Sequence, residues 1–167
     1  IPSSAGLRVL GAISGLDFQE IVYYINGESV VASPPGNYTA LALSADSQFL
    51  YAGRKSGQVT LFRRASGLLE EQNRFSVGGS IQGLHTERSG SVLVSTVNSR
   101  IKFFFHRQWP GIQAASRIWR LDGGTGQKEL VYADNARVVS GVTDALHLSG
   151  RLVLAQPYRA ASVACSL

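Results

Sequence analysis

The chain has 167 residues, of which 44% are hydrophobic and 16% charged, and it carries 16 Lys and Arg against 11 Asp and Glu. This balance supplies enough apolar material for the core of one ordinary domain and excludes a wholly disordered chain. The single cysteine excludes an internal disulfide framework and a zinc site built from several thiolates.

The placement of apolar and basic residues sets aside two further classes of protein. The longest uncharged run, 29–45, is interrupted by Pro34-Pro35-Gly36, so no transmembrane helix is expected. The net charge of +5 comes from basic residues spread from Arg8 to Arg159, which is typical of solvated strands and loops, so no nucleic-acid partner is expected. Because the chain begins with Ile1 and contains no Met, we expect a processed product or a segment of a longer protein.

Short apolar runs bounded by Ser, Gly, Asp or Asn predict strands along most of the chain. In 16–33, Asn26-Gly27 separates two apolar runs and predicts a hairpin, because both turn residues must accept positive φ. Three further runs of β-branched and aromatic residues follow, each bounded by a turn signal: 41–43, 49–52 and 59–62.

The same order of runs then returns. Val92 follows Phe49 by 43 residues and Ile101 follows Val59 by 42, which predicts strands at Ser91–Ser95 and Ile101–Phe105. A period of about 40 to 45 residues with this strand content is typical of a β-propeller blade. Further strands are expected at 116–121, 129–133, 145–148, 152–155 and 161–165.

The sequence therefore predicts an all-β fold, a partial β-propeller of four-stranded antiparallel blades covering about half of a six-bladed ring. The single domain, 1–167, divides into the outer hairpin of a preceding blade (16–33), a blade (38–80), a blade with an insertion (81–134) and a closing three-stranded blade (141–167). Half a ring leaves apolar faces in water, so we expect missing sequence or companion subunits to complete it. The alternative is a smaller β-sandwich.

Several segments resemble, in order and spacing, the C-terminal half of the paraoxonase and arylesterase family, a relative of the strictosidine synthase-like propellers. From Leu16 to the end these are 21–24, 43–46 with 49–52, 101–104, 131–133 and the closing 163–167. The resemblance implies a six-bladed propeller with calcium in its central tunnel, hydrolysis of lactones and aryl esters, and frequent secretion. In that family Asn and Asp oxygens on the inner strands hold the calcium, which polarises the ester carbonyl.

The chain departs from this family at the calcium-ligand positions. Thr39, with Asn37 two residues earlier, aligns with one ligand Asn, and Ile81-Gln82 aligns with an adjacent Asp-Asn pair. An Ile side chain cannot bind calcium, so Asn37, Thr39 and Gln82 are left as degenerate metal positions. We therefore assign no catalytic residue and expect no cofactor. The alternative is that the chain binds calcium.

Two functions follow from the resemblance and its departures. The first is a non-catalytic propeller, a pseudoenzyme that acts as a scaffold or interaction module in a larger protein or assembly. The alternative is a calcium-dependent arylesterase or lactonase whose remaining site residues lie in a missing half.

Two residues are candidates for covalent modification, one for a disulfide bond and one for glycosylation. In the family, a cysteine beside the C-terminus pairs with one near the N-terminus and closes the ring, which assigns Cys165 to half of a disulfide; the alternative is a thiol that packs as a small hydrophobe. Asn37-Tyr38-Thr39 is a glycosylation sequon, and a glycan there would conflict with a calcium role. Together with the family, the sequon suggests a secretory, extracellular or organelle-lumen location.

The remaining motifs have a structural interpretation beside a functional one. The histidines, His85, His106 and His147, are interpreted as structural, although Asp144 precedes His147 by three residues. Gly78-Gly79-Ser80 is expected to be a blade-to-blade turn rather than a nucleophile elbow, and 122–126 a hairpin loop rather than a phosphate cradle.

A dense aromatic cluster, Phe103-Phe104-Phe105 with Trp109, lies in the insertion of the second blade. If 101–105 is a strand, alternation sends Phe104 to one face and its two neighbours to the other, so core packing between blades is expected on both. The alternative is a lipid or partner patch around Trp109.

Overall fold

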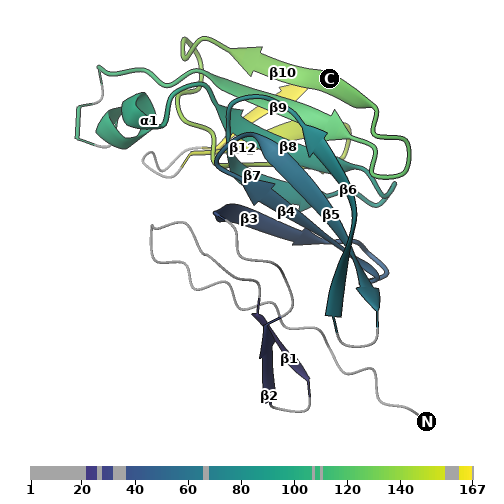
Figure 1. Cartoon of the computed structure of the whole chain (residues 1–167). Coiled ribbons are helices and arrows are strands. Elements are labelled where there is room, and N and C mark those ends of the chain that lie inside the picture. The colour runs from purple at the N-terminus through teal and green to yellow at the C-terminus, as the bar shows by residue number, and fades with distance from the viewer. Residues whose placement is uncertain are drawn as a thin grey trace.

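The computed structural model describes residues 22–25, 28–31, 37–65, 68–106, 108–109, 111–156 and 162–166. Within these ranges the chain forms antiparallel sheets and one short helix (Figure 1). The predicted all-β fold, a partial β-propeller, is confirmed. Among the described residues, no helix is long and apolar enough to cross a membrane.

Three large sheets follow one another along the chain, each with its strands in sequence order. The first contains β3 (Tyr38–Leu43), β4 (Phe49–Arg54), β5 (Gln58–Ala65) and β6 (Leu68–Ser76). The second contains β7 (Ser80–Thr86), β8 (Val92–Val97), β9 (Ser116–Leu121) and β10 (Lys128–Asp134). The third contains β11 (Asp144–Leu148), β12 (Arg151–Ala155) and β13 (Val163–Ser166).

A separate hairpin precedes these sheets. β1 (Val22–Ile25) pairs antiparallel with β2 (Glu28–Val31), as the apolar runs around Asn26-Gly27 predicted. The turn itself, 26–27, lies outside the described residues.

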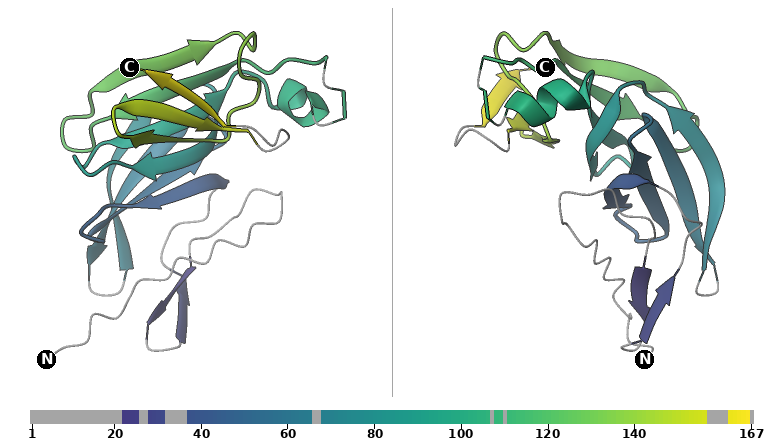
Figure 2. Two further views of the ribbon diagram at one scale, coloured as in Figure 1. Left: turned by 180° about the vertical axis from the view of Figure 1, so that it is seen from behind. Right: turned by 60° about the vertical axis from the view of Figure 1, so that its left-hand side comes forward.

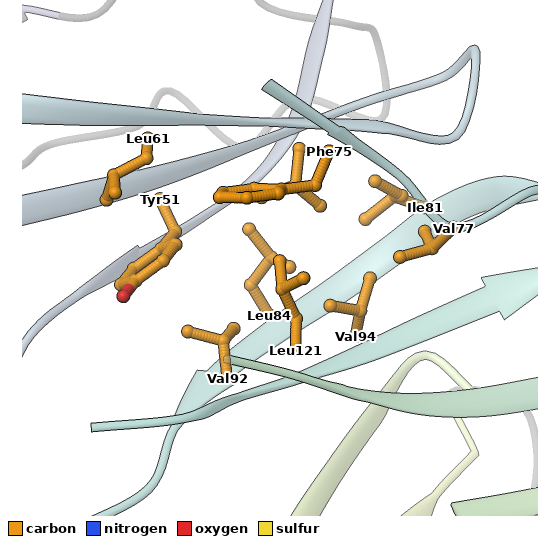
Figure 3. Close-up of a cluster of buried hydrophobic side chains, with 10 residues drawn as sticks. Tyr51, Leu61, Phe75, Val77, Ile81, Leu84, Val92, Val94 and Leu121 are labelled. Atoms are coloured by element: carbon orange, nitrogen blue, oxygen red, sulfur yellow. The ribbon is translucent and has the colours of Figure 1, made fainter. Parts of the chain in front are cut away.

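The three large sheets pack face to face through two apolar interfaces, with sheet β7–β10 between the other two (Figure 2). The interface with β3–β6 is shown in Figure 3, where side chains from the two sheets meet: Tyr51, Leu61, Phe75, Val77, Ile81, Leu84, Val92, Val94 and Leu121. The interface with β11–β13 contains Leu93, Ile118, Val139, Val142, Ala145, Leu152 and Leu154. Successive apolar interfaces of this kind are the packing expected of propeller blades.

The first strands of the sheets, β3, β7 and β11, are neighbours, with β7 in contact with both of the others. Their close approach depends on small residues. A Cβ added to Gly83 in β7 would overlap the carbonyl oxygen of Thr143, which lies just before β11. A Cβ added to Gly53 in β4 would lie 2.6 Å from Cγ2 of Ile81. Glycine at these positions therefore sets the spacing between neighbouring sheets.

The predicted strand at Ile101–Phe105 is wrong, because this segment lies in the helix α1 (Arg100–His106). Ser99 begins the helix: its carbonyl oxygen accepts the Phe103 N–H at 3.0 Å and its hydroxyl accepts the Lys102 N–H at 3.3 Å. The third strand of the second sheet is β9 instead, at a position also predicted as a strand. The repeat period had placed the third strand too early, because α1 is inserted between β8 and β9.

The expected core role of the aromatic cluster is also wrong. Phe104 is 64% exposed and Trp109 is 53% exposed, so neither fills the space between two sheets. Phe103 alone among the three phenylalanines of α1 is half-buried, beside Gly141.

We expect Gly83→Ala to destabilise the protein by about 1–3 kcal/mol, because the new methyl group must displace backbone in the contact between β7 and β11. Chemical denaturation of the purified chain measures this. Gly111→Ala is the matched control, since a Cβ at Gly111 meets open space. Equal stabilities of the two variants would contradict the close packing of the inner strands.

Candidate functional site: one rim of the inner strands

At one end of the three sheets, the first strands (β3, β7 and β11) begin and the second strands (β4, β8 and β12) end. The antiparallel register places Tyr38 opposite Arg54, Ser80 opposite Val97 and Asp144 opposite Ala155. The β4–β5 turn and the connection that carries α1 leave the sheets at this same end. This rim is the end at which the resemblance would place its calcium ligands.

A cavity of about 310 Å³ opens at the rim beside the first sheet, lined by Asn37, Arg54, Lys55 and Ser56. The Arg54 guanidinium lies 5.1 Å from the Tyr38 ring centroid, and its Nη2 donates to the Tyr38 hydroxyl at 3.4 Å. The Arg54 Nε is buried and has no hydrogen-bond partner among the described residues. The described wall of this cavity is therefore cationic and polar.

The three sequence-predicted metal positions lie near the starts of the inner strands but are engaged with the protein. The Thr39 hydroxyl donates to the Gly53 carbonyl oxygen at 3.3 Å. The Gln82 amide donates to the Ser80 carbonyl oxygen at 3.3 Å and to its hydroxyl at 3.2 Å. Asn37 lines the cavity together with two cationic side chains.

This donor set fits calcium poorly. Ile81 is fully buried against Gly53 and offers no oxygen. Calcium binds six to eight oxygens, preferably with carboxylates among them, and the charges of Arg54 and Lys55 oppose a divalent cation near Asn37. Within the described part of the chain, no group of three or more His, Cys, Asp or Glu is arranged to hold a metal ion. The calcium assignment of Asn37, Thr39 and Gln82 stays a prediction.

Charged side chains link the second and third sheets on their facing sides. Glu87, whose side chain is 9% exposed, accepts a hydrogen bond from Arg120 Nε at 3.0 Å and lies 3.3 Å from His147 Nδ1. Arg120 reaches Glu129 as well, through Nη1 at 3.0 Å. This arrangement ties β9 and β11 to the residue that follows β7, which is a structural role for His147.

The other two histidines differ in their surroundings. His106 is buried at the end of α1, and its Nδ1 is hydrogen-bonded to the Ile112 carbonyl oxygen at 2.7 Å, which is a structural role. His85 lies near Asp144 and acts on it electrostatically. Burial raises the pKa of the Asp144 carboxyl, while the Ala145 N–H and the charge of His85 act in the opposite direction.

The two glycine motifs have the structural forms expected. Gly78 and Gly79 both have positive φ and connect β6 to β7, between two blades. In the β9–β10 loop, Asp122 Oδ1 accepts the N–H groups of Gly124 and Thr125, each at 2.8 Å. That carboxylate occupies the amides that a phosphate would need, so the loop is not a phosphate cradle.

Cys165 is a half-buried free thiol in β13, opposite Leu152. It packs against the apolar interface between the second and third sheets. Within this chain it therefore behaves as a small hydrophobe, and the disulfide to another chain or segment stays a prediction. Glycosylation of Asn37 also stays a prediction; the residue is exposed at the rim of the cavity.

The sequence analysis missed the cationic wall formed by Arg54 and Lys55. The pair is visible in the sequence at the end of an apolar run. What the sequence does not show is that the β4–β5 turn returns to the start of β3, beside Asn37.

The comparisons with known proteins bear on the fold of the chain. No family model and no curated protein matches it. Among solved structures it is similar to Kuenenia stuttgartiensis hydrazine synthase (15% identity, TM-score 0.61), a gluconolactonase from Xanthomonas campestris (17%, 0.59) and a putative 6-phosphogluconolactonase from Bacteroides uniformis (14%, 0.53).

Each of these likenesses covers 81% of this chain but only 35%, 41% and 40% of the respective neighbours. The chain therefore spans about two fifths of the length of the structures it matches. At these identities the likeness shows the propeller-type fold, and not specifically the paraoxonase and arylesterase family.

We expect Glu87→Gln to lower the free energy of unfolding by about 1–3 kcal/mol, because it removes the charge that holds Arg120 and His147. Urea denaturation at neutral pH measures the change. Glu70→Gln, at an exposed position of β6, is the control and should stay close to the parent protein. A loss at Glu70 as large as that at Glu87 would contradict the linking role.

Proposed function

We propose that this chain is a non-catalytic β-propeller module that acts as a scaffold or interaction unit within a larger propeller or assembly. The observation that carries the proposal is Ile81, fully buried against Gly53 where the resemblance puts a calcium ligand. The cationic cavity wall beside Asn37 adds to it.

The outward face of the third sheet, β11–β13, is an argument for the proposal that this chain is part of a larger assembly. Alternation sends Ala145, Leu152 and Leu154 toward the second sheet, where they are buried. The opposite face carries the apolar side chains of Leu146, Leu148, Val153 and Ala164, which are only partly covered or exposed. The exposed polar residues Asp144, Arg151 and Ser166 lie on the same face. Leu148 is 60% exposed. The apolar part of this face fits a further blade, supplied by a missing half or a companion subunit.

A second candidate, a lactone or ester hydrolase, is favoured by two observations. Two of the similar solved structures bear lactonase names, one of them as a putative assignment. Asp144, with its raised pKa, lies near His85 at the inner strands, as an acid–base pair would. In this case the remaining site residues would come from the rest of a ring.

Calcium titration of the purified chain tests the first proposal. We expect excess calcium to leave the thermal unfolding midpoint unchanged, because a ligand that binds only the folded state would raise it. Asn37→Ala and Gln82→Ala should behave like the parent protein in the same titration. Stoichiometric calcium binding that either variant abolishes would contradict the proposal.

Turnover of simple lactones and aryl esters separates the two candidates. The non-catalytic proposal expects no turnover above the uncatalysed rate. Turnover that a chelator removes, and that Asp144→Asn reduces while the fold is retained, would favour the hydrolase.

A further inference from the structure

The apolar stripe of α1 faces solvent, which is the reverse of an ordinary surface helix. Ile101, Phe104 and Phe105 have the spacing of one helical face, and they are 71%, 64% and 37% exposed. Trp109, 53% exposed, extends this face, since its N–H donates to the Phe105 carbonyl oxygen at 2.8 Å and the two ring centroids are 5.3 Å apart. We call these four residues the α1 patch.

The opposite face of α1 fixes this orientation. Phe103 lies against Gly141, whose positive φ and missing Cβ leave room for the ring. His106 is buried and hydrogen-bonded to the Ile112 carbonyl oxygen. Figure 1 shows α1 at one side of the molecule, outside the three sheets. The α1 patch is therefore held outward by packing on its other side, and a rotation of the helix would expose His106.

The chain segment that carries the α1 patch is rich in positive charge and has no acidic residue. No Asp or Glu occurs between Glu87 and Asp122, whereas α1 itself carries Arg100 and Lys102. Lys102 is exposed beside Ile101. A surface with aromatic side chains next to cations is suited to binding the interface of an anionic membrane. The rings insert into the headgroup region, and the cations pair with the lipid phosphates.

We propose that the α1 patch docks this protein on an anionic lipid surface. A second copy of the chain is a less favourable occupant, because it would bring the exposed Lys102 of one copy toward that of the other. A lipid surface supplies the negative charge and accommodates protruding rings without a matching groove. The proposal is independent of whether the inner-strand rim is catalytic, since α1 contributes none of the residues of that rim.

Vesicle co-sedimentation of the full chain tests the proposal. We expect binding to vesicles of phosphatidylcholine with phosphatidylserine, weaker binding to pure phosphatidylcholine, and a decrease with added salt. The double variant Phe104→Ser/Trp109→Ser should lose about tenfold or more in affinity, because it removes two exposed rings that the membrane would bury. Lys102→Glu should weaken binding by about fivefold or more. Leu130→Ser, at an exposed apolar position of β10, is the matched control and should bind normally.

Fluorescence gives a second readout from the patch itself. The chain has two tryptophans, and Trp119 lies half-buried in β9 with its Nε1 unpaired among the described residues. In a Trp119→Phe background the emission comes from Trp109, and we expect a blue shift with the phosphatidylserine vesicles. Circular dichroism of each variant confirms that the sheets are retained.

Three outcomes would overturn the proposal. The parent protein does not bind the anionic vesicles; or the patch variants bind as well as the parent protein; or the chain self-associates and the patch variants abolish that association without changing vesicle binding. The last outcome would assign the patch to a second copy of the chain.

Discussion

Burial of β8 on both faces is the constraint on which the rest of the structure depends. All six residues of this strand are buried: Val92 and Val94 face the first sheet, and Leu93 faces the third. A sheet covered on both sides must be apolar on both, and its neighbours must supply matching faces. This requirement orders the three sheets as successive blades and leaves the outward face of the third sheet only partly covered.

The same packing shapes the inner-strand rim. Close approach of the sheets requires glycine at Gly53 and Gly83, and it fills the space beside Gly53 with Ile81. At the starts of β3 and β7, the Thr39 hydroxyl and the Gln82 amide donate hydrogen bonds to the protein itself. The buried Ile81, at the position where the resemblance puts a calcium ligand, and the cations at the cavity wall are the observations behind the proposed non-catalytic propeller.

Local signals in the sequence were enough for most of the fold. The runs around Phe49 and Val92 are short apolar stretches that end at turn residues, so each strand is indicated by its own local sequence. The recurrence of these runs then gives the period of the blades. The segment 101–105 could not be assigned this way. Its β-branched and aromatic residues favour a strand, whereas the helix depends on the Ser99 cap and on Phe103 packing against the distant Gly141. The cationic wall at Arg54 likewise arises from a contact across the sheet with Tyr38.

Hydrogen–deuterium exchange, resolved by strand, tests the central place of β8 most directly. If the doubly covered sheet holds the fold together, amides of β8 exchange only on global unfolding and are the slowest in the chain. Amides of β10, an outer strand of the same sheet with mostly exposed or half-buried residues, then exchange faster. Exchange in β8 as rapid as in β10 would contradict the account.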